Sequence, residues 1–215
     1  MPLPLNRYID HTLLRPEATA EEIKKVCEET LQYKFASACL LPVWAEYARS
    51  LLHGAKLCCV VGFPIGGNTT QAKAFETEEL VKWGVDELDM VLALGKLKSR
   101  DFDYVLQDIR AVVQAAEHSL VKVIIETCLL TDEEKRVASL LCKEAGAHFV
   151  KTSTGFSKAG ATVEDVMLIR KTVGPDMGIK ASGGIRSAET ALAMIEAGAT
   201  RIGTSSATSW CVCND

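Results

Sequence analysis

Short β-type runs alternate with helical patterns along the whole of this 215-residue chain, and this alternation restricts the fold more than any other feature. Strands that alternate with helices form parallel sheets, because the crossover between two parallel strands needs a dozen or more residues. Eight such runs can be read from the sequence, and the first is the weakest. They are 7–11, 36–41, 57–62, 86–91, 121–126, 147–151, 177–181 and 200–204.

The helices between these runs carry their own start and stop signals. Capping-box patterns, with an acidic residue three positions after Thr, occur at Thr19 with Glu22, Thr131 with Glu134 and, less fully, Thr162 with Asp165. Glycine stands between a helix and the next strand at Gly84, Gly146 and Gly198. Such glycines suit the left-handed C-cap of a helix, so their recurrence indicates a repeated βα unit.

The sequence therefore predicts an α/β protein, a single (β/α)8 barrel of the TIM type that occupies residues 1–215 as one domain. No linker or low-complexity stretch interrupts the series. A doubly wound open sheet is the alternative, but no glycine-rich dinucleotide fingerprint follows the early strands. Few residues, 207–215, follow the last strand segment. We therefore expect a shortened closing helix or a neighbouring subunit that covers this side.

Composition and charge narrow the range of partners. The formal net charge of −4 argues against nucleic acid or an anionic membrane surface. No apolar run approaches the roughly 20 residues of a membrane span, and the N-terminus lacks the features of a signal peptide. We expect a soluble cytoplasmic protein that forms a homodimer or a higher homo-oligomer. Most of its eight cysteines fall inside predicted elements and are expected to be reduced, buried thiols.

Two lysines close successive strands, each followed by small residues: Lys151 in VKTSTGF and Lys180 in IKASGGIR. A nucleophilic amine must be neutral. Lowering the pKa of a lysine from about 10.4 to about 7 needs roughly 4–5 kcal/mol. A second ammonium about 4 Å away supplies roughly 4 kcal/mol at an effective dielectric near 20. Neighbouring strands lie about 4.8 Å apart, so the pair can approach that closely. The pattern favours an enzyme that works through a Schiff base.

Strand alternation places further charged side chains on the same inward face as these lysines. So much paired charge inside a barrel is hard to explain as packing. Ordinary ion pairs remain the alternative for Lys151 and Lys180, and Glu87 with Lys122 is better explained as a structural pair. The expected inward set is Asp10, Glu87, Asp89, Lys122, Glu126, Lys151 and Lys180.

A phosphate site is expected at the ends of the last two strands, where glycines let the backbone approach an anion closely. An ordinary strand-to-helix turn is the alternative for the Gly-Gly pair. The candidate phosphate-binding residues are Gly183, Gly184, Gly203, Ser205 and Ser206.

These motifs together resemble the deoxyribose-phosphate aldolase family, and the similarity runs over nearly the whole chain. Besides the two lysine motifs, the matching segments are 9–14 (IDHTLL), 60–64 (VVGFP), 68–70 (NTT), 87–91 (ELDMV) and 121–127 (VKVIIET). The resemblance implies a class I aldolase without metal or organic cofactor. Its expected reaction is the reversible cleavage of 2-deoxy-D-ribose 5-phosphate to acetaldehyde and D-glyceraldehyde 3-phosphate, in deoxyribonucleoside catabolism.

The resemblance also implies a role for each catalytic candidate. Lys151 matches the Schiff-base lysine and Lys180 the second lysine that activates it. Asp89 matches the carboxylate that moves protons together with water, and Asp10 an aspartate that supports this relay.

The chain departs from many relatives at Leu41 and Ala93, where they carry Asn, and at Phe156, where some carry Lys that Lys158 could replace. If these departures disable the site, the chain is a non-catalytic phosphosugar-binding barrel. A different phosphosugar barrel, such as an isomerase or another Schiff-base aldolase, is a separate alternative.

Overall fold

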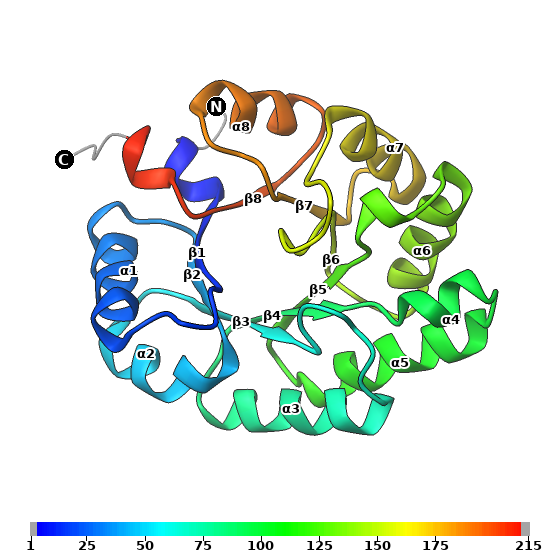
Figure 1. Cartoon of the computed structure of the whole chain (residues 1–215), viewed down its shortest axis with the longest axis horizontal. Coiled ribbons are helices and arrows are strands. Elements are labelled where there is room, and N and C mark those ends of the chain that lie inside the picture. The colour runs from blue at the N-terminus through cyan, green and yellow to red at the C-terminus, as the bar shows by residue number, and fades with distance from the viewer. Residues whose placement is uncertain (1–3, 212–215) are drawn as a thin grey trace.

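The computed structural model describes residues 4–211, in which eight parallel strands close into a barrel (Figure 1). Each strand pairs with the next along the chain, and β8 pairs with β1. This closure confirms the predicted fold and excludes the open doubly wound sheet. The strands are β1 (Ile9–Leu13), β2 (Ser37–Leu40), β3 (Leu57–Val61), β4 (Glu87–Val91), β5 (Leu120–Ile124), β6 (Phe149–Lys151), β7 (Gly178–Ser182) and β8 (Arg201–Thr204).

The α-helices form an outer ring around these strands (Figure 1). They are α1 (Ala20–Gln32), α2 (Ala45–Leu51), α3 (Thr70–Lys82), α4 (Leu94–Lys98), α5 (Phe102–Ala115), α6 (Asp132–Glu144), α7 (Val163–Val173) and α8 (Ala188–Glu196). Short 3-10 helices occupy Leu5–Tyr8, Pro42–Trp44, Thr127–Leu129 and Ala207–Ser209. The first of these explains why β1 begins later than the sequence suggested.

Local signals in the sequence correctly predicted where the helices begin and end. Thr19 and Thr131 form full capping boxes with Glu22 and Glu134, whereas Thr162 only accepts a hydrogen bond from the Asp165 backbone amide. The glycines that precede three of the strands all have positive φ, namely Gly84, Gly146 and Gly198. The repeated βα unit is therefore built from the same local devices each time.

The main apolar core lies between the strands and the helices. Val150 and Ile179, which flank the two candidate lysines in the sequence, are fully buried in it. Because successive strand residues face opposite sides, Lys151 and Lys180 point into the barrel. The outer layer thus supplies the apolar burial, and polar groups fill much of the interior.

The described part of the chain ends soon after β8. A 3-10 helix at Ala207–Ser209 follows this strand, and no α-helix does so before residue 211. The sequence analysis expected a shortened closing helix over 207–215. Residues 212–215 of this segment lie outside the described part of the chain. Within residues 4–211, none of the helices combines the length and apolarity needed to cross a bilayer.

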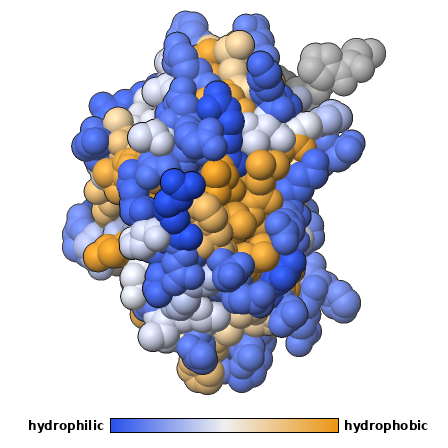
Figure 2. Space-filling model, turned by 90° about the vertical axis from the view of Figure 1, so that its right-hand side faces the viewer, coloured by the Kyte–Doolittle hydropathy of each residue, from blue (hydrophilic) through white to orange (hydrophobic). Residues whose placement is uncertain are grey.

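The surface has one face with a group of apolar side chains, on the side of the barrel where α6 lies (Figure 2). Between α6 and α7 a surface hollow is lined in part by Leu140 and Met167. Leu140 is 51% and Met167 58% exposed, which is high for large apolar residues.

A buried ion pair that the sequence did not reveal joins α3 to α5. The Lys73 ammonium lies 2.6 Å from a carboxylate oxygen of Asp108, and both side chains are fully buried. The same ammonium donates to the Val91 carbonyl at the end of β4, and Thr70 donates to the other oxygen of Asp108. These contacts tie the two helices to the end of a barrel strand.

We expect Lys73→Met to destabilise the fold by about 3–5 kcal/mol, because it leaves the Asp108 carboxylate buried without its cation. Urea unfolding followed by circular dichroism measures the change. The matched control is Lys73→Met with Asp108→Leu, which removes both charges and should recover most of the loss. Equal destabilisation in the single and double variants would contradict this account.

Candidate active site

The two candidate lysines lie side by side inside the barrel. Lys151 of β6 and Lys180 of β7 are register partners. Their amines contact the same oxygen of Asp89, at 2.8 Å from Lys151 and 2.7 Å from Lys180. Because both nitrogens contact one oxygen atom, the distance between them is at most the sum of these two distances. At such a separation two amines interact strongly if both are charged.

Asp89 is the centre of the site. Its second oxygen accepts from the Lys122 ammonium at 2.8 Å, so three lysines contact one buried carboxylate. Burial would raise the pKa of Asp89, but the positive charges of Lys122, Lys151 and Lys180 outweigh burial and hold it well below its usual range. Asp89 is therefore an anion at neutral pH.

Lys180 has a second carboxylate partner. Its ammonium lies 2.5 Å from Asp10, a residue of β1 that is also fully buried. Burial would lower the pKa of Lys180, yet the charges of Asp10 and Asp89 outweigh burial and raise it. Lys180 is consequently held as a cation beside Lys151, as an activating neighbour must be.

Asp10 and Glu87 extend the network below the lysines. Arg201 of β8 lies 2.6 Å from Asp10 and 2.7 Å from Glu87, and Glu87 lies 2.7 Å from Lys122. Ser37 donates a further hydrogen bond to Asp10 at 2.7 Å. The structure thus brings together six of the seven expected inward residues and adds two that the sequence analysis missed, Arg201 and Ser37.

Glu126 is the expected inward residue that does not join this network. β5 ends at Ile124, and Glu126 adopts a left-handed backbone conformation with φ of 53°. Its carboxylate accepts hydrogen bonds from the backbone amide and hydroxyl of Thr154. Glu126 therefore stands apart from the ion-pair network and lines a separate cavity, because strand alternation gives no guide beyond the end of β5.

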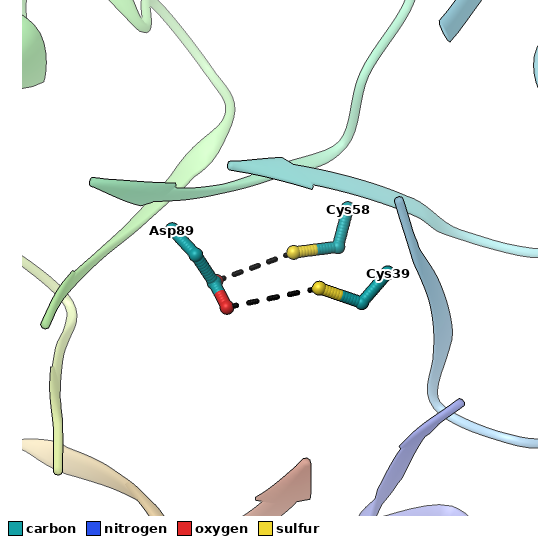
Figure 3. A group of neighbouring side chains, drawn as sticks. All are labelled: Cys39, Cys58 and Asp89. Carbon is teal, nitrogen blue, oxygen red and sulfur yellow. Dashed lines mark hydrogen bonds between the residues drawn. The ribbon is translucent and has the colours of Figure 1, made fainter. Parts of the chain in front are cut away.

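Two buried thiols face Asp89, Cys58 from the neighbouring strand β3 and Cys39 from β2 (Figure 3). Cys58 lies 3.2 Å and Cys39 3.9 Å from the carboxylate oxygens. The ligand atoms of Cys39, Cys58 and Asp89 lie within 4.8 Å of one another, a spacing that could hold a metal ion. The ammonium groups of Lys122 and Lys180 on Asp89 would repel a cation there, so the residues do not fit a metal site.

A cavity of about 300 Å³ opens above Lys151 at the carboxyl ends of the strands. Its wall contains Arg15 and Arg186 in addition to Lys151, and no Asp or Glu. Of the expected phosphate-binding residues, Gly183, Gly184, Gly203 and Ser205 line it. Ser206 does not line it; its backbone amide donates to the Thr204 hydroxyl. Arg15 is paired with Glu17 and Glu22, so Arg186 and the backbone groups of the glycine loops are what suit this cavity to an anion.

Gly183 is required by the geometry of this wall. Its φ is 83°, and a Cβ atom there would lie 2.9 Å from the Cα of Gly160. Only glycine satisfies both constraints without moving the neighbouring loop. The Gly-Gly motif is therefore more specific than a generic turn, and it keeps a backbone loop close to the cavity.

A larger cavity, of about 780 Å³, lies beside the first and shares Thr154 and Phe156 with it. It is lined by Ala93 but not by Lys151, and its Lys96 is paired with Asp101 at 2.9 Å. Size alone would favour this cavity, whereas Lys151 lines the smaller one. Leu41 and Lys158 line neither cavity.

A lysine-centred site at the carboxyl end of a (β/α)8 barrel defines a class I aldolase. The DeoC/LacD family aldolase model matches residues 6–208, and the chain belongs to this family. A deoxyribose-phosphate aldolase of Streptococcus sanguinis strain SK36 is 62% identical over 205 residues, covering 94% of this chain and 93% of that protein. One from Brevibacillus brevis strain 47 is 58% identical over 207 residues, covering 95% and 94%.

Solved structures agree with this assignment. The aldolase QR15 superposes with a TM-score of 0.94 at 41% identity and covers 96% of this chain and 94% of its own. The deoxyribose phosphate aldolase of Aeropyrum pernix, described as tetrameric, superposes with a TM-score of 0.89 at 37% identity, covering 95% and 88%.

Proposed function

We propose that this chain is a deoxyribose-phosphate aldolase, which reversibly cleaves 2-deoxy-D-ribose 5-phosphate to acetaldehyde and D-glyceraldehyde 3-phosphate. One observation carries the proposal: Lys151 lines an anion-suited cavity while its amine contacts the anion of Asp89 beside the cation of Lys180. The relatives named deoxyribose-phosphate aldolase support the choice of substrate.

The charge balance of the interior network favours a neutral Lys151. Burial disfavours an unpaired charge, so a buried network is most stable when its acids and bases balance. Here the bases outnumber the acids by one, and the excess proton leaves most readily from the amine with the fewest partners. The acids are Asp10, Glu87 and Asp89, and the bases are Lys122, Lys151, Lys180 and Arg201.

In the proposed mechanism, neutral Lys151 attacks the aldehyde carbon of the open-chain sugar and, with loss of water, forms a protonated imine. A water molecule oriented by Asp89 takes the proton of the C3 hydroxyl, and the C2–C3 bond breaks. The imine accepts the electron pair as an enamine, which is protonated at C2 and hydrolysed to acetaldehyde. Because Asp89 is kept ionised by three lysines, it stabilises these cationic intermediates and orients the water.

Asp10 supports this chemistry indirectly, in our proposal. It holds the Lys180 ammonium at 2.5 Å and keeps it charged. Lys180 then opposes a second positive charge on Lys151. This role differs from that of a group that touches the substrate.

The phosphate is proposed to bind at the loops after β7 and β8. Gly183, Gly184, Gly203 and Ser205 offer backbone and hydroxyl groups, and Arg186 adds a charge at the edge of the same cavity. A remote charged group of this kind orients the sugar over the reactive amine.

We expect reduction with borohydride in the presence of acetaldehyde to attach an ethyl group to Lys151 alone, because only this amine is proposed to form the imine. Peptide mapping by mass spectrometry locates the label. Lys180 serves as the internal control, since it is buried nearby but is expected to stay unlabelled. An unmodified Lys151 in well-folded protein would sink the proposed function.

We expect Arg186→Met to raise KM for 2-deoxyribose 5-phosphate by about 10-fold or more, since a hydrogen bond to a charged group contributes about 1.5–3 kcal/mol. The KM for unphosphorylated 2-deoxyribose should stay unchanged. Steady-state kinetics with both sugars separates these effects. Arg7→Met, an exposed arginine in the first 3-10 helix, is the matched control and should alter neither value. Equal losses for both sugars would contradict a phosphate contact.

We also propose that the chain works in the cytoplasm as a homo-oligomer, with neither nucleic acid nor membrane as a partner. The exposed apolar side chains between α6 and α7 and the tetrameric relative support self-association. Light scattering coupled to gel filtration is expected to give at least twice the 23.3 kDa chain mass. A monomeric mass across the working concentration range would refute this assembly.

A further inference from the structure

Arg201 lies inside the barrel and enters the chemistry above only through its charge, with no contact to the cavity. It is the first residue of β8, and its side chain extends beneath the lysines, with its guanidinium 5.5 Å from the centre of the Phe149 ring. The residue is 9% exposed and lines neither cavity. A buried guanidinium needs charged partners, and Arg201 has two, Asp10 and Glu87.

The contacts of Arg201 determine how much negative charge is left for the lysines. Asp10 is shared between Arg201 and Lys180, at 2.6 and 2.5 Å. Glu87 is shared between Arg201 and Lys122, each at 2.7 Å. Without Arg201, three carboxylates would face three lysines, and the network would balance only if every lysine were protonated.

Lys151 is the base in this network with the fewest acidic partners. Among residues 4–211, Lys151 forms an ion pair with Asp89 alone, whereas Lys180, Lys122 and Arg201 each contact two or more carboxylates. When the total charge of the network changes, Lys151 is therefore the first group to gain or lose a proton.

We propose that Arg201 and Glu87 are positioning residues that set the protonation state of Lys151 from a distance, Arg201 favouring the neutral amine and Glu87 the ammonium. This role rests on the proposed function of Lys151 as the nucleophile. Neither residue touches the cavity, so their effect on substrate is carried entirely by charge.

Other titratable groups surround Lys151, and the test must separate them. From the remaining strands these are Asp89, Lys180, Lys122, Asp10, Cys39 and Cys58. Glu126 is engaged with Thr154, and Lys56, 3.5 Å from Glu87, has a side chain that is 54% exposed, so solvent screens its charge. A hydrogen bond with Cys58 lowers the pKa of Cys39 to about 7 against the effect of burial.

The experiment measures the rate at which acetaldehyde and cyanoborohydride label Lys151 as a function of pH, because only the neutral amine reacts. A charge about 10 Å away in a medium of effective dielectric near 20 displaces a titration by about one pH unit. We therefore expect the midpoint of labelling to rise by about one unit in Arg201→Met and to fall by about one unit in Glu87→Gln. The parent protein and all variants carry Cys39→Ser, so that the thiol, whose pKa of about 7 falls within the pH range measured, contributes to none of the midpoints.

Two further variants separate charge from structure. Arg201→Lys keeps the charge and should retain the midpoint of the parent protein, and Arg201→Met with Glu87→Gln restores the balance and should return to it. If Arg201→Met does not fold, the difference of about one unit between Glu87→Gln and the double variant tests the same charge effect. Folded variants whose midpoints stay together, or move in the same direction, would overturn the proposal.

The outcome is distinguishable from failure of the proposed function. If wild-type Lys151 takes up no label at any pH, the Schiff-base chemistry is wrong. If it is labelled normally but the variants do not separate as described, only the charge role of Arg201 and Glu87 is wrong.

Discussion

The contact of one buried carboxylate with three lysines is the interaction on which the rest of the site depends. Moving Asp89 out of water is costly, and the ion pairs with Lys122, Lys151 and Lys180 offset that cost only while all of them remain in place. The usual filling of a small parallel barrel is layers of branched apolar side chains. Here the apolar burial comes mainly from the layer between strands and helices, which leaves the interior free for a reactive polar network.

The sequence predicted this interior well because it follows from two simple regularities. Alternation along a strand placed Asp10, Glu87 and Asp89 on the face that carries the lysines, and closure of the barrel made the face common to all strands. The same rule gives no guide at Glu126, since it holds only while the backbone is extended. Arg201 was missed for a different reason: nothing local distinguishes an arginine at the start of a strand that turns inward from one that reaches solvent.

The anion-suited cavity could be predicted only in part. Glycines mark where backbone can approach a ligand, and Gly183 has the positive φ and the close neighbour that justify this interpretation. Which hydroxyls face the cavity depends on the detailed path of the loop. Ser205 lines it, whereas the next residue, Ser206, hydrogen-bonds back to Thr204. Arg15 and Arg186 come from opposite ends of the chain, and their convergence follows from the closure of β1 against β8.

The division of labour between the two lysines follows from their neighbours, because the side chains are chemically identical. β7 lies next to β8, which in turn pairs with β1, so Lys180 can reach Asp10 as well as Asp89. β6 lies one strand farther away, and Lys151 has Asp89 as its carboxylate partner and the open cavity on its other side. Two carboxylates hold Lys180 as a cation, whereas Lys151 has a single counter-charge and access to substrate. Strand order, rather than any property of the residue type, thus selects position 151 for attack.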